Sequence, residues 1–161
     1  MPHLEDLLCQ YYDWQGYVVR RNVKVGRLGH GGWEGELDIV AYHPTSQDLL
    51  HLEPSIDALS WNKRRERFDK KFRSGRKFIF TEVFPWLSRE TPLTQIAVLI
   101  SRSADHATIG SGTVVTIDEI TKQIREKVTA RGKMATSAIP EQYDLLRTVQ
   151  LTESGYYRRL S

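Results

Sequence analysis

Apolar residues recur at two different spacings along the first part of the chain, and each spacing predicts a different element. Residues 4–14 carry leucines and aromatic residues at helical spacing and stop before Gly16, which predicts an amphipathic helix. Three shorter segments are rich in β-branched and aliphatic residues and alternate in part. They predict strands at residues 17–25, 33–42 and 48–53. Because the turns between them are short, we expect an antiparallel meander whose last strand ends at Pro54.

The remainder of the chain switches between helical and strand patterns. Phe68 and Phe72 share one face of a predicted helix at residues 57–73, which Ser74-Gly75 is expected to close. The further elements predicted are strands at residues 78–80, 95–101 and 113–117, a helix at 118–130 capped by Asp118, a helix at 141–147, and a tail from Val149 that forms an edge strand or a partner-binding arm. A helix placed between the meander and the next strand lets that strand pair in parallel. The order therefore predicts an α/β fold with a mixed sheet flanked by helices.

The composition is that of an ordinary globular domain. The 161 residues, 40% apolar and 27% charged, predict one domain spanning residues 1–161. The single cysteine, Cys9, excludes an internal disulfide framework and a thiolate zinc site. The chain has neither a signal-peptide pattern nor an apolar run of membrane-spanning length. We therefore expect an intracellular, cytoplasmic protein with no membrane partner.

The net charge of +3 conceals a segregation of acidic and basic residues. Residues 28–62 contain six carboxylates and no lysine or arginine, whereas residues 62–77 contain nine basic residues and two acidic ones. Basic helices bind phosphate backbones through counterion release, and a solvated helix face is the alternative interpretation. Nine basic residues against two acidic ones favour nucleic acid. The residues expected to contact DNA phosphates are Lys63, Arg64, Arg67, Lys70, Lys71 and Arg73.

The carboxylates of the acidic segment lie where a cation site is expected. Glu34, Glu36 and Asp38 are spaced by two along one predicted strand, which places them on one face of the sheet. The turn at residues 43–48 returns the chain antiparallel and brings Glu53 beside Asp38. Two such carboxylates repel each other unless a cation lies between them, and Mg²⁺ suits this pair. Solvated carboxylates are the alternative interpretation. The histidines of this region lack the helical spacing of a zinc hydrolase site: His30, His43 and His51.

The chain resembles the PD-(D/E)XK nuclease superfamily, in particular its Holliday-junction-resolvase and Mrr-type branches, in two adjacent runs: GELDIVA at 35–41 and LHLEPS at 50–55. The resemblance covers residues 4–101 and implies a restriction-endonuclease-like α-β-β-β-α-β core, followed by a strand, a helix and a tail at residues 102–161. It implies a metal-dependent endonuclease that hydrolyses the phosphodiester bonds of DNA, with Mg²⁺ or Mn²⁺ as cofactor. The implied metal ligands are Asp38, Glu53 and the backbone carbonyl of Pro54, with Glu5 and Glu36 in outer positions.

Ser55 stands where the superfamily motif has a catalytic lysine. A serine hydroxyl is neutral and cannot supply the positive charge of that lysine. Three explanations are open. A lysine of the following helix occupies the site, with Lys63 as the first choice and Lys70 as the second; the metal ion suffices alone; or the site is degenerate. The last explanation predicts a catalytically inactive nucleic-acid-binding or protein-interaction module. A nuclease that cuts both strands usually needs two active sites, so a C2 homodimer is compatible with the first two.

Overall fold

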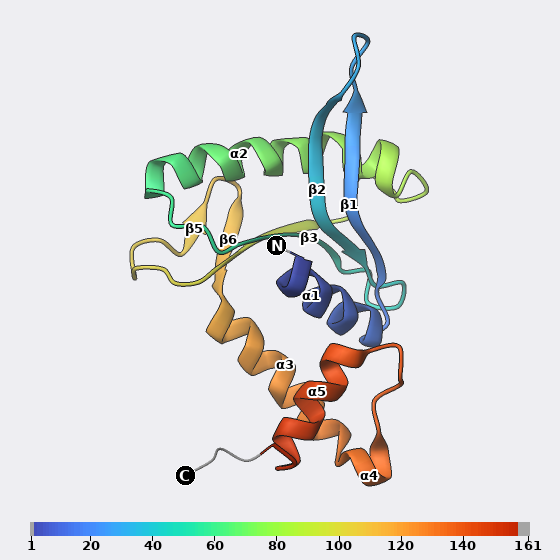
Figure 1. Cartoon of the computed structure of the whole chain (residues 1–161). Helices are drawn as coiled ribbons and strands as arrows, with labels where there is room; N and C mark the ends of the chain where they lie inside the picture. Colours follow the sequence, from blue (N-terminus) through green and yellow to red (C-terminus); the bar gives the residue numbers. More distant parts are fainter. Residues whose placement is uncertain (1, 158–161) are drawn as a thin grey trace.

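Six strands form one mixed sheet in the order β1-β2-β3-β4-β6-β5 (Figure 1). The computed structural model describes residues 2–157. The strands are β1 (Val18–Arg27), β2 (Trp33–Tyr42), β3 (Leu49–Ser55), β4 (Leu93–Leu99), β5 (Thr108–Ile109) and β6 (Gly112–Thr116). The helices are α1 (Pro2–Trp14), α2 (Trp61–Phe78), the π-helix η1 (Ile79–Val83), α3 (Ile117–Arg131), α4 (Met134–Ser137) and α5 (Asp144–Glu153).

The strands pair in the predicted topology. β1, β2 and β3 form an antiparallel meander, and α2 carries the chain from β3 to β4, which pairs with β3 in parallel. β6 joins β4 in parallel, and the short β5 pairs antiparallel with β6. The α/β class, the mixed sheet flanked by helices and the element order α-β-β-β-α-β from α1 to β4 are therefore confirmed.

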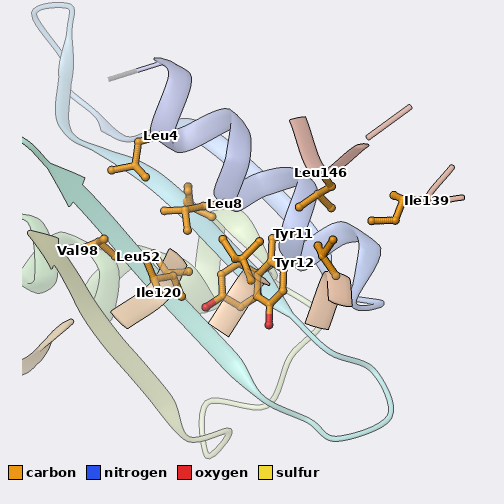
Figure 2. Close-up of a cluster of buried hydrophobic side chains, with 13 residues drawn as sticks. Leu4, Leu8, Tyr11, Tyr12, Leu52, Val98, Ile120, Ile139 and Leu146 are labelled. Atoms are coloured by element: carbon orange, nitrogen blue, oxygen red, sulfur yellow. The ribbon is translucent and has the colours of Figure 1, made fainter. Parts of the chain in front are cut away.

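Helices cover both faces of the sheet. On one face, α1, α3 and α5 pack apolar side chains, including Leu8, Ile120 and Leu146, against β-strand residues such as Leu52 and Val98 (Figure 2). On the opposite face, α2 and η1 close two smaller clusters. Burial of apolar surface on both faces explains why the central strands are almost continuously apolar. Asp38 and Glu53, the two candidate residues on adjacent strands, lie on the α2 face.

The helix after the meander differs from the prediction at both ends. α2 begins at Trp61 rather than at residue 57, and it runs through Ser74 and Gly75 to Phe78 before the π-helix η1. The strand predicted at residues 78–80 is therefore wrong. Ser74 and Gly75 do not end the helix because they face the sheet, where α2 approaches it most closely. A Cβ at position 75 would lie 2.3 Å from His51 Nδ1, so only glycine fits there.

The third strand also continues further than predicted, through Pro54 to Ser55. Its pairing with β2 ends where Leu52 lies opposite Ile39, whereas its pairing with β4 includes Pro54 opposite Val98. Proline lacks an N–H, and it is tolerated where a strand is paired on one side only. Because β3 continues along β4, Glu53 is held inside the sheet with 1% exposure.

The C-terminal elements are displaced from their predicted positions. The N-cap of α3 is Thr116 rather than Asp118, since the Thr116 side chain and Glu119 form a capping box. α5 lies at Asp144–Glu153, so the helix predicted at 141–147 is displaced and residues 149–153 are helical instead of an edge strand or arm. Gln150 on this helix is buried, and its Oε1 accepts a hydrogen bond from the Ile139 N–H at 2.9 Å. Residues 158–161 of the predicted tail lie outside the described residues. No helix within residues 2–157 is long and apolar enough to cross a membrane.

Candidate functional site

Asp38 of β2 and Glu53 of β3 lie side by side, as the sequence predicted. Ile39 pairs with Leu52, and Asp38 and Glu53 are the next residues along the two antiparallel strands. The backbone N–H of Asp38 donates to Glu53 Oε1 at 3.2 Å. The register of β2 with β3 therefore positions the two carboxylates, because each is the chain neighbour of the last residue paired between these strands.

The ammonium group of Lys71 bridges the two carboxylates. Lys71 is on α2, and its Nζ donates to Asp38 Oδ1 at 2.6 Å and to Glu53 Oε2. Burial opposes the charge on Lys71, but Glu53 and Asp38 outweigh it and raise the pKa of the ammonium group. Burial, followed by the neighbouring Glu53, raises the pKa of Asp38 from 3.8 to about 6, although Lys71 opposes this shift. The cluster thus holds a permanent cation between two carboxylates that compete for it.

Glu53 is also held by a buried histidine. His51 is fully buried, and its Nε2 lies 2.7 Å from Glu53 Oε1. On the other side of the ring, Gln95 Nε2 lies 3.0 Å from His51 Nδ1. Burial, together with the charge of Lys71, lowers the pKa of His51 from 6.5 to about 3. His51 is therefore neutral near pH 7.

The contacts on the two sides of the His51 ring require the same tautomer, since the Glu53 carboxylate at Nε2 only accepts and the Gln95 amide nitrogen at Nδ1 donates. Gln95 Nε2 donates to the backbone carbonyl of Phe72 at 2.8 Å. Gln95 Oε1 accepts from Arg76 at 2.9 Å and from Ser111 at 2.7 Å. Because both ends of the amide have partners of the correct kind, Gln95 Nε2 is the donor toward His51 Nδ1. The neutral ring then carries its proton on Nε2 and donates it to Glu53.

Ser55, at the motif position of the missing lysine, does not join the carboxylate cluster. Its hydroxyl is buried and donates to Asp57 Oδ2 at 2.5 Å. Arg67 also contacts this oxygen at 2.5 Å. Pro54, between Glu53 and Ser55, is buried and pairs with Val98 of β4. Strand β3, which carries Glu53, Pro54 and Ser55, therefore supplies no positive charge to the site.

The lysine in the site is Lys71, not Lys63 or Lys70. Lys63 is exposed and forms no ion pair with any residue in the described range 2–157. It precedes Lys71 by eight residues, which is about 12 Å along a helix. Lys70 is exposed and lines the neighbouring cleft, and it forms no ion pair with Asp38 or Glu53. The sequence held a signal for Lys71, since it lies three residues after the buried Phe68 and four before the buried Gly75 and so falls on the inward face of α2.

The two outer glutamates are not joined to this pair as a metal site. Glu5 is buried on α1, with its carboxylate 3.7 Å from the Arg21 guanidinium. Glu36 is exposed. No group of three or more His, Cys, Asp or Glu side chains within residues 2–157 is arranged to hold a metal ion. Of the predicted acidic set, the structure thus brings together Asp38 and Glu53.

The predicted alternation of Glu34, Glu36 and Asp38 on one face is interrupted at Asp38. A Cβ on Gly35 would meet Ser74 of α2, Leu37 packs in the α2-side cluster, and Asp38 also reaches α2. Gly35, Leu37 and Asp38 therefore all face α2, although strict alternation would place Asp38 on the side opposite to the other two. The opposing residue on β1 is Asn22, whose φ of 50° marks a local break in the strand. Asp38 keeps the alternation of Val40 and Tyr42 on the α2 face, and beyond the break Leu37 and Gly35 also turn toward α2.

A cleft of about 240 Å³ opens beside Lys71, between the outer part of β2 and α2. Its lining residues are Glu34, Gly35, Glu36, Arg67, Lys70, Lys71 and Ser74. Arg67 and Lys70 add positive charge next to the Lys71 ammonium. The cleft is thus a space in which an anionic group can approach the site.

Apart from Lys71, the α2 residues predicted to contact DNA phosphates fall into two groups. Arg64 and Arg67 are engaged within the protein, since Arg64 donates to the Asp57 carbonyl at 2.9 Å and Arg67 contacts the Asp57 carboxylate. Lys63, Lys70 and Arg73 form no ion pair within the described part of the chain. These three residues remain available to an external anion.

Comparisons with models of protein families, with curated proteins and with solved structures give no match. The chemistry of the site is therefore inferred from its own residues.

Proposed function

We propose that this chain is a metal-dependent endonuclease that hydrolyses phosphodiester bonds of DNA, with a restriction-endonuclease-like core. The observation that supports this most directly is the cluster of Asp38, Glu53 and Lys71. Three elements, β2, β3 and α2, contribute one residue each. Two carboxylates and an ammonium group beside a basic cleft match the requirements of phosphodiester hydrolysis, which are a cation site and a positive charge near the phosphate.

The residues present fit a hard divalent cation. Asp38 and Glu53 offer carboxylate oxygens, the ligand type that Mg²⁺ and Mn²⁺ prefer, and neutral His51 adds no competing charge. When both are ionised, the two carboxylates exceed the single ammonium by one negative charge. Burial, and after it the neighbouring Glu53, raises the pKa of Asp38 more than Lys71 lowers it. Asp38, Glu53 and, by the superfamily resemblance, the carbonyl of Pro54 would hold the ion, which when bound would acidify a water molecule and neutralise charge on the phosphate.

The other residues have separable roles in this proposal. Lys71 takes over the role of the motif lysine and stabilises negative charge at the scissile phosphate. Lys70 and Arg67 line the cleft and orient the phosphate group. Lys63 and Arg73 extend the positive surface of α2 and bind neighbouring phosphates without reading sequence.

The experiment compares cleavage of plasmid, branched and single-stranded DNA by the wild type, Asp38→Asn and Asp105→Asn, with Mg²⁺, with Mn²⁺ and with EDTA. Asp105 is exposed and distant in sequence from the cluster, so its variant controls for the loss of one carboxylate. We expect metal-dependent cleavage by the wild type and Asp105→Asn, and at least a 100-fold loss for Asp38→Asn. Absence of cleavage on every substrate, or equal cleavage by Asp38→Asn, contradicts the proposal.

A second candidate is a catalytically inactive DNA-binding module. The observation that favours it is Ser55, whose hydroxyl is bound to Asp57 and leaves the motif strand without a cation. This function predicts salt-sensitive DNA binding without cleavage, with an affinity that Asp38→Asn does not lower. The same set of proteins and DNA substrates distinguishes the two functions.

A further inference from the structure

A continuous chain of buried polar side chains runs from the surface of α2 to Glu53. Arg76 and Ser111 donate to Gln95, Gln95 donates to His51, and His51 donates to Glu53. His51 is 0% exposed, Gln95 5% and Glu53 1%. Every polar atom of the His51 ring and of the Gln95 amide has a partner in this chain.

This arrangement costs stability that an apolar core would retain. Burying a histidine and a glutamine requires that each hydrogen bond be made, whereas apolar side chains of similar size need none. Gly75 adds a further cost, because glycine inside a helix is less favourable than alanine. Glycine is required there, since a Cβ would lie 2.3 Å from His51 Nδ1 and 3.0 Å from Gln95 Nε2. Phe72 limits the ring from another side, with the two rings edge to face at 5.5 Å.

The contacts also divide the two oxygens of Glu53 between neutral and charged partners. Oε1 accepts from two neutral donors, the His51 ring and the Asp38 backbone N–H. Oε2 accepts from the Lys71 ammonium. With Oε1 held in this way, Oε2 is the oxygen that faces a cation.

We propose that His51 and Gln95 are positioning residues that fix the Glu53 carboxylate, with His51 donating from Nε2 and Gln95 holding the ring by donating to Nδ1. This inference rests on the proposed function for the statement that the cation is a divalent metal ion. The tautomer and the Gln95 contact follow from the hydrogen bonds alone. Residues that orient a carboxylate ligand in this way typically change metal affinity by 10- to 100-fold when they are replaced.

The first experiment determines the His51 tautomer by long-range ¹H–¹⁵N correlation spectra of the metal-free protein. We expect the proton on Nε2 in the wild type and in Gln95→Met, because the Glu53 carboxylate accepts from Nε2 in both, and a shifted Nδ1 resonance in Gln95→Met, which loses the donor to that nitrogen. A proton on Nδ1 in the wild type, or an unchanged Nδ1 resonance in Gln95→Met, overturns the proposal. This experiment requires no metal and no DNA, so it holds its value if the proposed function fails.

The second experiment measures Mn²⁺ affinity and thermal stability for the wild type, His51→Gln and His51→Leu. The glutamine amide can still donate to Glu53 Oε1, whereas leucine of similar volume cannot. We expect His51→Leu to bind Mn²⁺ at least 10-fold more weakly, and His51→Gln to stay within about 3-fold of the wild type. A merely structural role would lower the melting temperature of both variants without separating their Mn²⁺ affinities, and that result overturns the proposal.

The outcomes separate this inference from the proposed function. Equal Mn²⁺ binding by all three proteins, with metal-dependent cleavage intact, removes the inference alone. Absence of Mn²⁺ binding by the wild type removes the proposed function, while the tautomer spectra still decide the roles of His51 and Gln95. If His51→Leu does not fold, the wild-type and Gln95→Met spectra decide the question.

Discussion

The ammonium nitrogen of Lys71 lies 2.6 Å from Asp38 Oδ1, although 33 positions separate the two residues along the chain. The same ammonium also contacts Glu53, so it joins three elements that the chain reaches in succession. In the proposed nuclease, this contact supplies the ammonium group that a lysine at the position of Ser55 would provide. It also removes Lys71 from the group of surface cations in which its neighbours Lys70 and Arg73 remain.

Replacing Lys71 is expected to abolish cleavage, whereas replacing Lys63 is not. Lys71→Met removes the only ammonium that contacts the carboxylates among residues 2–157, and we expect cleavage to fall by about 10²- to 10³-fold. Lys63→Met removes an exposed charge and is expected to change cleavage by less than about 5-fold at low salt. Initial rates on the best DNA substrate measure both.

Lys71→Met also leaves Glu53 without its cation, which is expected to destabilise the fold by about 3 kcal/mol. Lys71→Arg keeps the charge and provides the folded comparison, and circular dichroism establishes the folded fraction for each protein. Full activity of folded Lys71→Met would show that another group supplies the charge. Cleavage that is lost on replacing Lys63 instead of Lys71 would show the same.

Asp38→Asn is expected to stabilise the protein above pH 6. Because the folded-state pKa of Asp38 is raised from 3.8 to about 6, the fold favours the protonated carboxyl, and ionisation costs up to about 3 kcal/mol. This cost is absent below pH 3.8 and complete above pH 6. The contribution of Asp38 to the free energy of unfolding of the wild type therefore falls as the pH rises between these values. Urea denaturation at pH 4, 5, 6, 7 and 8 in EDTA measures the difference between the two proteins.

The stabilisation by Asp38→Asn is expected to disappear near pH 4 and to shrink when Mg²⁺ is added at pH 8, since an ion bound by the wild type stabilises only the wild type. Asp105→Asn is the control and is expected to match the wild type at every pH. A constant difference between Asp38→Asn and the wild type from pH 4 to pH 8 would contradict this origin.

Gly75→Ala is expected to destabilise the protein although alanine favours a helix. The new Cβ would lie 2.3 Å from His51 Nδ1, so α2 must move away from β3 or the His51–Gln95 hydrogen bond must break. We expect a loss of about 2 kcal/mol, equivalent to a melting temperature lower by about 4–8 °C. Gly29→Ala is the matched control, because no atom lies within 4 Å of its added Cβ, and it should leave the melting temperature nearly unchanged. Equal melting temperatures of the two variants would show that α2 does not approach His51 this closely.

The DNA contacts of α2 are expected to come from its unpaired cations. Lys70→Ala/Arg73→Ala removes two charges that form no ion pair within residues 2–157, and we expect the slope of log affinity against log salt to fall by about 2. Arg64→Ala removes a half-buried group bound to Asp57, so it should lower stability more than DNA affinity. Fluorescence anisotropy with a labelled duplex in EDTA measures binding without cleavage.

The control for this comparison is Lys127→Ala/Lys133→Ala, which removes two exposed lysines outside α2, one on α3 and one in the loop before α4. It tests whether net charge alone weakens binding. The same salt slope for both double variants would assign the effect to net charge and not to the α2 surface.

Local pattern was sufficient for most of the fold. Strand β2 lies at the predicted residues, and the register of β2 with β3 follows from a short turn, so the pairing of Asp38 with Glu53 was predictable. The C-terminal boundary of α2 was not, because Ser74 and Gly75 are helix-ending residues in isolation and become helix-compatible only where α2 meets the sheet. The position of α5 was not predictable for a related reason. It buries Gln150, whose Oε1 accepts a hydrogen bond from the distant Ile139 N–H.

The sequence by itself determined the order of elements, the juxtaposition of the two carboxylates and the separation of acidic from basic residues, because each depends on spacing within a few residues or across one turn. Only the tertiary structure decided which of the α2 lysines reaches the carboxylates, and it alone revealed the chain from Gln95 through His51 to Glu53. Both depend on how α2 crosses the sheet. That crossing is set by the packing of Phe68, Phe72 and Gly75 against strands distant in the sequence, and no local pattern encodes its position.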